Sequence, residues 1–277
     1  MGLLLALGLA CGKQRGFDSI REEAAGRGNR HYQNQMGVIY QTGKDGDGKK
    51  WETDYVKALN WFIAAGTPTN HVVQKGEKVV DLLKRYRVFF KDLKNNKVNR
   101  TNGVDFVNMK PGTRVEIPGF GPAMYNAGAM YETRYEDLGF KKKEDALEKA
   151  AEWYAKGAEA GFIRAQFAYG YALEYGQGVK RDLKQAGNWY ELSAKQGLAA
   201  AQGRLAQLHF TGFGDSKKRN LIDAYLWYGI TKKTLQSEGK ELDPALEKAF
   251  NTCQRSLPAG DQSRVDRLIQ DFRALEK

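Results

Sequence analysis

Residues 153–190 read WYAKGAEAGFIRAQFAYGYALEYGQGVKRDLKQAGNWY, and the landmarks of this stretch return 36 residues later. The recurring pairs are Trp153 and Trp189, Gly161 and Gly197, Ala165-Gln166 and Ala201-Gln202, and Gly176-x-Gly178 and Gly212-x-Gly214. A fixed period of about 20 to 50 residues is typical of stacked-repeat proteins, whose units bury their apolar faces only against each other. Binding is therefore a better first expectation for this chain than catalysis.

One repeat unit is predicted to be an antiparallel pair of helices. Apolar residues between 146 and 159 recur every three or four positions, which places them on one stripe of a helix. A second helix is predicted from about Arg164 to Tyr175, where glycines 176 and 178 end it. Asp182 is well placed to cap the helix that follows.

The same frame extends toward both ends of the chain. An early copy of the second helix is predicted at His31 to Gln41, and Asp54 is expected to cap the helix after it. Downstream, Ala224, Trp227 and Tyr228 begin another unit, so about four units are expected. Divergent final helices, predicted near Pro244 to Arg255 and Asp261 to Leu275, would cap the stack.

At these landmarks the chain resembles the Sel-like repeat family, which is related to the tetratricopeptide repeats. The residues that match the family pattern are Ala186, Trp189, Tyr190, Ala194, Gly197, Ala201, Gln202, Gly212 and Gly214. The resemblance implies a right-handed helix-pair solenoid that serves as a protein-binding scaffold, often in bacterial envelopes.

The repeat frame also reveals an insertion. Gly37 precedes its equivalent Gly128 by 91 residues, which exceeds one period of 36 by 55 residues. The insert should follow a linker at 66–70 and end at Pro118-Gly119. Its predicted elements are a strand at His71 to Gln74, helices at Val79 to Tyr86 and Phe90 to Asn95, and a strand at Thr113 to Ile117.

Both ends of the insert resemble a lysin motif (LysM), a small α+β module. The matching stretches are Val72-Val73-x-x-Gly76-Glu77-x-Val79-x-x-Leu82 and Lys110-Pro111-Gly112-x-x-Val115-x-Ile117-Pro118. The resemblance implies binding of N-acetylglucosamine-containing glycans, either peptidoglycan or chitin, in a shallow groove between two loops. One wall would be Gly76, Glu77, Lys78 and Val79, and the other Asn108, Met109, Lys110 and Pro111.

The charge of the chain suits an anionic partner. The formal net charge is +11, and residues 70–119 carry 11 Lys and Arg against 5 Asp and Glu. A polyanion or cell-wall polymer is one explanation, and ordinary surface solvation is another. Nucleic acid is not expected as a partner because no nucleic-acid-binding motif is legible.

The first residues bear on location. Met1 to Ala10 is almost wholly apolar and too short to span a bilayer, and Gly8-Leu9-Ala10-Cys11 resembles the lipobox of bacterial lipoproteins. We therefore predict lipidation at Cys11 and a place in the periplasm or cell envelope, with membrane attachment only through this lipid anchor. The other cysteine, Cys253, is predicted to be a half-buried helix residue, so no disulfide framework is implied.

No catalytic residue, metal ligand or cofactor is predicted. Residues 43–50 mimic a phosphate-binding loop, but Lys50 replaces the required Ser or Thr. His31, His71 and His209 lack metal-ligand spacing and a partnered nucleophile. The Trp61, Trp153, Trp189 and Trp227 series follows the repeat period and is predicted to pack between units, with a sugar platform as the alternative.

The predicted fold class is mostly α, a solenoid of Sel-like repeats with an inserted βααβ domain. The expected segments are 1–11 (signal), 12–66 (first repeats), 67–119 (LysM-like insert) and 120–277 (further repeats and caps). The predicted function is a non-catalytic envelope adaptor that binds peptidoglycan or a related glycan and an unidentified envelope protein. The alternatives are a cell-wall enzyme or its direct regulator, and a cytoplasmic protein-interaction scaffold.

Overall fold

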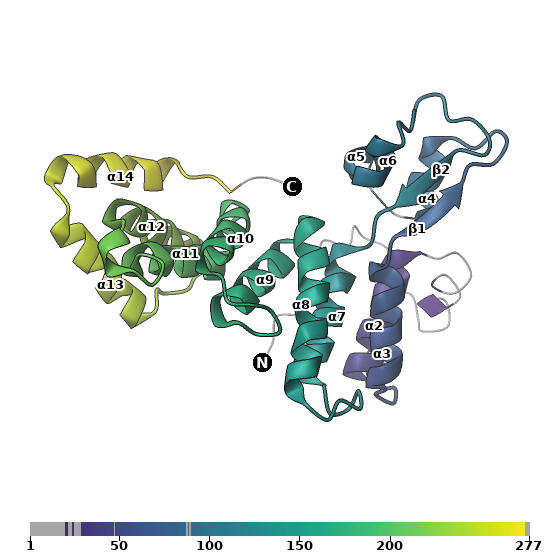
Figure 1. Ribbon diagram of the computed structural model, residues 1–277, viewed down its shortest axis with the longest axis horizontal. Coiled ribbons are helices and arrows are strands. Elements are labelled where there is room, and N and C mark those ends of the chain that lie inside the picture. The colour runs from purple at the N-terminus through teal and green to yellow at the C-terminus, as the bar shows by residue number, and fades with distance from the viewer. Residues whose placement is uncertain are drawn as a thin grey trace. The chain divides into compact units, whose positions relative to one another are not determined.

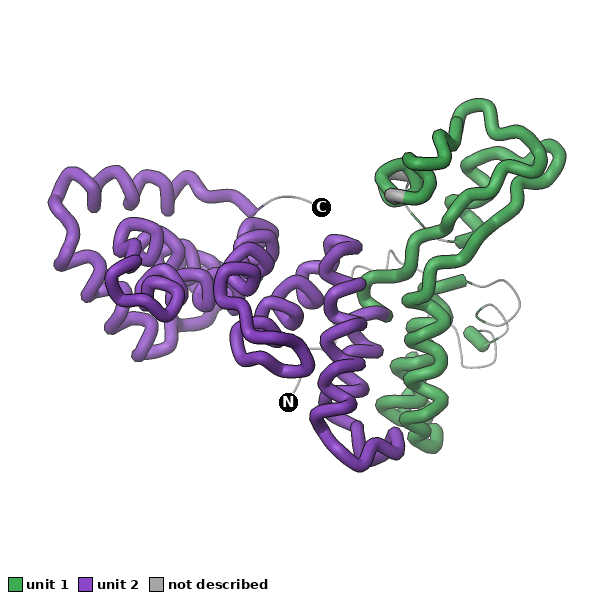
Figure 2. The backbone as a smooth tube through the Cα atoms, in the orientation of Figure 1, with its two compact units in different colours: residues 1–123 green, residues 124–277 purple. Residues whose placement is uncertain are grey.

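The computed structural model describes residues 20–21, 24, 29–46, 48–86, 88 and 90–274. These residues form a mostly helical chain with one two-stranded sheet among them (Figure 1). The chain divides into two compact units, residues 1–123 and residues 124–277 (Figure 2). The predicted lipobox, with Cys11, lies outside the described residues. No described helix is long and apolar enough to cross a membrane.

The first unit contains a helix pair, α2 (Arg30–Thr42) and α3 (Tyr55–Gly66). The Asn29 side chain accepts hydrogen bonds at the start of α2, and Gly43 ends that helix in the left-handed conformation. The Asp54 side chain accepts a hydrogen bond from the Lys57 N–H at 2.8 Å, which confirms its predicted capping role.

The second unit continues the helix-pair pattern and ends in two further helices. Its elements are α7 (Gly121–Thr133, which spans the boundary), α8 (Lys143–Glu159), α9 (Ile163–Tyr175), α10 (Leu183–Lys195), α11 (Ala199–Thr211), the short 3₁₀ turn η1 (Ser216–Lys218), α12 (Leu221–Ser237), α13 (Pro244–Ser256) and α14 (Ala259–Asp271). Asp182 caps α10 as predicted. The prediction that the last helix reaches Leu275 is wrong, because α14 ends at Asp271.

A glycine in the first helix of each of three pairs lies directly under an aromatic ring of the second helix. The pairs are Gly37 with Phe62, Gly128 with Tyr154, and Gly170 with Tyr190. A Cβ at any of these glycines would overlap the ring, so the residue must lack a side chain for the helices to approach this closely. The glycine is thus a packing requirement within these three helix pairs, whereas the equivalent residue of the pair α11 and α12 is Ala206.

The repeated glutamine satisfies a helix end. Gln166 and Gln202 are buried, and each side-chain amide donates to a carbonyl near the end of the preceding helix, at 3.4 Å to Ala158 and 3.2 Å to Ala194. These bonds add a side-chain donor to carbonyls that also accept from Gly161 N–H and Gly197 N–H, both at 2.9 Å, where the helix ends. In the first unit, Gln33 makes the equivalent bond at 3.3 Å to Ala24.

The tryptophan series and Cys253 belong to the hydrophobic core. Trp153 and Trp227 are buried, and Trp61 and Trp189 pack against the core clusters of their own units. The four tryptophans are therefore core residues. Cys253 lies on α13 and is fully buried, deeper than the half-buried position predicted from the sequence.

The insert is a two-stranded sheet whose strands are joined by three short helices. Its elements are β1 (Thr69–Val72), α4 (Val79–Tyr86), α5 (Phe90–Asn95), α6 (Lys97–Thr101) and β2 (Arg114–Ile117). The strands pair antiparallel, with Thr69 opposite Ile117 and Val72 opposite Arg114. The two ends of the insert therefore lie side by side, and α4 and α5 have the predicted bounds.

Three expectations for the insert need correction. The first strand runs from Thr69 to Val72 and not from His71 to Gln74, because Thr69 and Asn70 already pair with β2 and a turn starts at Gln74. The predicted linker at 66–70 is the end of α3 and the start of β1. The expected βααβ order omits a helix, since α6 forms between α5 and β2 and is capped by the Asn96 side chain.

The core of the insert is small and relies on one buried amide. Its buried apolar residues are Val73, Leu82, Leu93, Phe106, Val115 and Ile117. Asn99, at 1% exposure, donates to the carbonyls of Leu93 and Glu116 at 3.0 and 2.8 Å and accepts from the Glu116 N–H at 2.7 Å. One side chain thus holds α5, α6 and β2 together.

A buried arginine joins the insert to the first helix pair. The Arg30 guanidinium, on α2, donates to the carbonyl oxygens of Ile117 and Pro118 and to the Thr69 hydroxyl. It therefore contacts both ends of the insert at once. Burial lowers the pKa of Arg30 to about 10, so the side chain is still a cation at neutral pH.

Candidate binding surfaces

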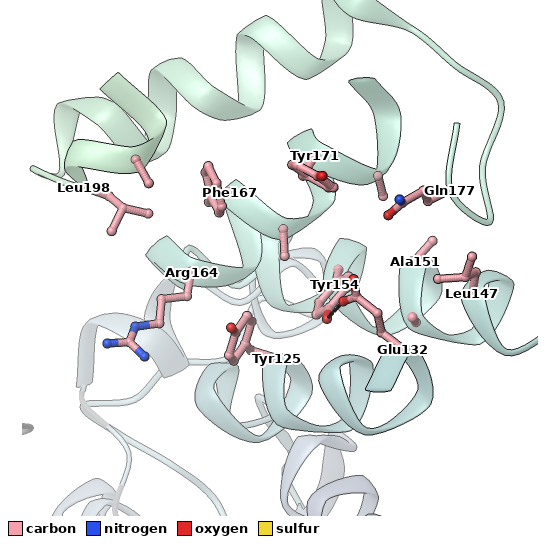
Figure 3. A pocket seen from close by; sticks show the side chains of 14 residues that line it. Tyr125, Glu132, Leu147, Ala151, Tyr154, Arg164, Phe167, Tyr171, Gln177 and Leu198 are labelled. Carbon is pink, nitrogen blue, oxygen red and sulfur yellow. Dashed lines mark hydrogen bonds between the residues drawn. The ribbon is translucent and has the colours of Figure 1, made fainter. Parts of the chain in front are cut away.

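The second unit contains a cavity of about 480 Å³ (Figure 3). It is lined by residues from three consecutive helices, α7, α8 and α9, from the turn after α9, and from the start of α11. These residues are Tyr125, Glu132, Leu147, Ala150, Ala151, Tyr154, Arg164, Phe167, Ala168, Tyr171, Ala172, Gln177, Leu198 and Ala200. We call this set the repeat groove.

Aromatic rings and small side chains make up most of the repeat groove. Tyr125 and Phe167 occupy the same position in successive repeats, and the Tyr125 ring lies 5.7 Å from that of Tyr154. Phe167 lies 6.4 Å from Tyr171 between ring centroids. Alanines of α8 and α9 also line the cavity, and their small side chains leave it open. Such a wall can enclose an apolar side chain of another molecule.

The two charged residues of the groove differ in their surroundings. The Tyr154 hydroxyl donates to the Glu132 carboxylate at 2.6 Å, and burial beside this carboxylate raises the pKa of Tyr154. The Arg164 side chain is exposed and makes no hydrogen bond or ion pair with any described residue. Figure 3 shows Arg164 at one end of the groove and Gln177 at the other.

A stacked cation borders the groove beyond Tyr171. The Arg204 guanidinium lies 5.4 Å from the ring centroid of Tyr171 and 5.5 Å from that of Tyr175. It also bonds to the Tyr175 hydroxyl at 2.7 Å and lies 3.5 Å from the Glu174 carboxylate. These contacts fix Tyr171 in place, so this wall of the groove is pre-organised.

The second candidate surface is on the insert, where the structure brings the two predicted glycan-binding loops together. The Val73 N–H donates to Thr113 O and the Gly112 N–H donates to Val73 O, both at 2.9 Å. The turn at 74–77 and the turn at 110–113 therefore leave the sheet at the same end. The side chains of Lys78, Asn108, Lys110 and Pro111 are exposed there, and Gly76 has a φ of +81° with open space around it.

The other predicted wall residues face inward. Glu77 is mostly buried, and its carboxylate accepts from the Gln74 N–H at 3.0 Å and contacts Arg85 at 2.9 Å. Val79 and Met109 are partly buried against the core of the insert. At these three positions a ligand could contact backbone groups, but little of the side chains.

One cluster in the insert was not predicted. The buried His71 ring bonds to the Glu77 carboxylate at 2.6 Å through Nε2 and to the Tyr86 hydroxyl at 3.0 Å through Nδ1. Burial alone would raise the pKa of Glu77, but the Gln74 N–H, His71 and Arg85 together lower it below its ordinary value. The cluster ties β1, the turn at 74–77 and α4 together, so it supports one of the two loops.

A comparison with known families decides which family the chain belongs to. The Sel1 repeat model matches residues 31–67, 121–162, 163–198 and 199–230, which is more than half of the chain. The chain belongs to the Sel1 repeat family. Each match covers one helix pair, and the unmatched stretch between the first two matches contains the insert. Arrays of such repeats are scaffolds for protein–protein interaction, and a Sel1 repeat surface therefore implies a protein partner.

Curated relatives of this Sel1 repeat protein come from fungi. Chitin synthase regulatory factor 3 of Schizosaccharomyces pombe is 37% identical over 95 residues, which cover 34% of this chain and 10% of the relative. Chitin synthase regulator SKT5 of Saccharomyces cerevisiae is 35% identical over 114 residues, which cover 40% of this chain and 16% of the relative. The similarity thus spans a tenth to a sixth of these relatives.

One solved structure shows the same fold, and a second is similar over most of this chain. A Sel1 repeat protein from Oxalobacter formigenes aligns over 93% of this chain and 83% of its own, with a TM-score of 0.50 and 17% identity. The c5321 protective antigen of uropathogenic Escherichia coli, described as displaying an SLR fold, aligns over 90% of this chain and 46% of its own, with a TM-score of 0.47 and 23% identity.

Proposed function

We propose that this Sel1 repeat protein is a non-catalytic adaptor of the cell envelope. Its repeats hold a protein partner in the repeat groove, and its insert binds a glycan that contains N-acetylglucosamine. The observation that carries the proposal is the groove itself, because an apolar hollow with exposed polar groups at its ends suits a ligand better than it suits solvent.

The glycan-binding half of the proposal draws on the insert. The LysM resemblance at both ends of the insert is accompanied by an antiparallel strand pair whose two loops meet. Peptidoglycan and chitin share the sugar, so either polymer would suit this groove. A single shallow site buries little area, and we expect weak binding.

The relatives favour a second candidate for the repeats. Two of them are named as regulators of chitin synthase. This chain would then act as a direct regulator of an enzyme that makes or cuts a wall polysaccharide, through the same repeat groove. A cytoplasmic scaffold is the remaining alternative. It differs from the envelope adaptor in where the protein resides.

Location rests on the N-terminal motif. Lipidation of Cys11 would attach the protein to a membrane through acyl chains. Metabolic labelling with a fatty-acid analogue should mark the wild type and not a Cys11→Ala variant. An unmarked wild type would remove the lipid anchor from the proposal.

Glycan binding is tested by sedimentation of the full chain with purified peptidoglycan and with chitin. We expect a weakly bound fraction that soluble N-acetylglucosamine oligomers compete away. Replacing the exposed loop residues Asn108 and Lys110 with alanine should abolish it. A matched control replaces the exposed Asn102 and Lys94 elsewhere on the insert. Binding that responds equally to both variants, or only to salt, would indicate charge alone and refute the glycan site.

Partner binding is tested by crosslinking in cells. A photoreactive residue at Phe167 should capture one protein, whereas the same residue at the exposed Lys248 on α13 should not. The captured band should disappear when Tyr171→Ala is added. A band that is equally strong from both positions would show that the repeat groove is not the binding surface.

A further inference from the structure

We propose that the repeat groove recognises a peptide segment in which a large apolar side chain stands within a few residues of an Asp or Glu. This inference rests on the proposed adaptor function and specifies its ligand. It follows from three features of the groove: its aromatic walls, the state of its two charged groups, and the departure of Arg164 from the repeat pattern.

The walls select an apolar side chain. In Figure 3 the rings of Phe167 and Tyr171 and the ring of Tyr154 border the same hollow. The volume of about 480 Å³ lies within the range of pockets that enclose most of a small ligand, and alanines form the surface between the rings. An aromatic or long aliphatic side chain would replace water there and contact the rings on more than one side.

The charged groups select an acidic neighbour. Glu132 already accepts a short hydrogen bond from Tyr154, and in Figure 3 the rings of Tyr125 and Tyr154 lie between it and Arg164. Arg164 makes no hydrogen bond or ion pair with a described residue, although its charge acts on the Tyr125 hydroxyl. A guanidinium beside an apolar surface offers two parallel N–H donors, and a carboxylate matches them best.

Arg164 is also an exception within the repeats. The equivalent positions in the other three repeats are His31, Pro122 and Ala200, so the helix-pair architecture does not require a cation there. The Arg164 side chain contributes no bond to the fold. Its position at one end of the groove therefore points to an anionic group on a ligand.

The test starts from a phage library of random heptapeptides selected on the full chain. We expect enrichment of sequences that pair Phe, Trp, Leu or Met with a nearby Asp or Glu. A fluorescent copy of the most enriched peptide is then titrated by anisotropy. Arg164→Glu should weaken its binding more than tenfold, because a charge-assisted bond becomes a repulsion. The Lys248→Glu control makes the same change of charge on α13 and should alter binding less than twofold.

A reciprocal change sharpens the result. Replacing the acid of the peptide with Lys should weaken binding to the wild type and restore it on Arg164→Glu. Tyr171→Ala should weaken both peptides, with circular dichroism showing that the variant is folded. The inference would be overturned if the selected peptides shared no acidic residue. It would also be overturned if Arg164→Glu and Tyr171→Ala left peptide binding unchanged.

Two further outcomes separate this inference from the adaptor proposal. If the photoreactive residue at Phe167 captures a partner and the peptide preference is absent, the adaptor proposal stands and the peptide motif is refuted. If chitin oligomers displace the fluorescent peptide from the groove of the wild type, the groove is a sugar site and the inference is refuted as well.

Discussion

The repeats and the insert are stabilised in opposite ways. In the repeats each contact type recurs, as in the glycine under an aromatic ring and the buried glutamine on a helix end. In the insert and at its junction with α2 the decisive contacts occur once and are polar, as in Asn99 and Arg30. A repeated apolar contact spreads its energy over several copies, whereas a single buried polar group concentrates it at one residue. Damage should therefore stay local in the insert and spread between neighbouring repeats.

The largest effect is expected from Asn99→Leu in the insert. The substitution leaves two buried carbonyls and one N–H without partners, and we expect a loss of about 3 kcal/mol in the stability of the insert. Hydrogen exchange followed by mass spectrometry should show rapid exchange over 69–117 and unchanged protection in α8 to α12. Asn102→Leu, at an exposed position one turn away, is the control and should change neither region. Loss of protection in the second unit as well would show that damage to the insert does not stay local.

A smaller loss is expected from Gly128→Ala in the repeats. The new methyl group would lie 2.6 Å from the Tyr154 ring, and overpacking of this kind costs about 2 kcal/mol. Gly260→Ala on α14 is the matched control, since nothing lies within 4 Å of its added Cβ. Alanine there should stabilise the helix by about 0.5 kcal/mol. Urea unfolding measures both, and a neutral Gly128→Ala would mean that the ring can move aside.

The third prediction concerns the junction of the insert and α2. Replacing residues 68–119 with a short Gly/Ser turn removes all three partners of the buried Arg30 guanidinium. We expect the deleted chain to remain helical, and Arg30→Leu to stabilise it by about 1 kcal/mol, because an unpaired buried cation is costly. In the full chain the same substitution should destabilise the protein by a similar amount, since it leaves three hydrogen-bond acceptors without their donor.

Circular dichroism and thermal melting of the four proteins in this cycle decide the point. Equal effects of Arg30→Leu in the two backgrounds would show that Arg30 does not join the insert to α2. Collapse of the helical signal on deletion would show that the insert is an integral part of the first unit.

The same contrast explains what the sequence could predict. The repeat period located α8 to α12, and Asp54 and Asp182 marked the starts of α3 and α10, because these features depend on residues close in sequence. The short helix α6 was missed because five residues carry no period. Arg30 could not be linked to Ile117 from the sequence, because the contact joins residues 87 positions apart. Only the fold brings such pairs together.

The candidate surfaces follow the same rule. Loop residues of the insert were named from motif resemblance, but the inward turn of Glu77 depends on His71 and Arg85, which the motif does not place. The repeat groove was predicted only as a surface for a partner, without its residues. Comparison of the repeats position by position would have identified Arg164, since alignment with His31, Pro122 and Ala200 marks it as an exception.

The smallest expected effect is a pH dependence confined to the insert. The fold lowers the pKa of Glu77 below its ordinary value of 4.5, so the ionised carboxylate stabilises the insert above about that pH. This contribution should fade as the pH falls through the lowered pKa, when protonation of Glu77 weakens its bonds to Gln74, His71 and Arg85.

Hydrogen exchange at a series of pH values between 7 and about 3, corrected for the intrinsic rate, measures this dependence in each region. We expect protection around β1 and α4 to fall before protection in α8 to α12 does. Glu77→Gln should be less stable at pH 7 and should flatten the pH profile of the insert, because the amide cannot ionise. Asp105→Asn is a suitable control, since the pKa of this exposed carboxylate is also lowered, chiefly by the Asn108 N–H, but outside the cluster. If Asp105→Asn flattens the profile and Glu77→Gln does not, the acid sensitivity belongs to the loop before β2, and the buried cluster supports the insert by packing alone.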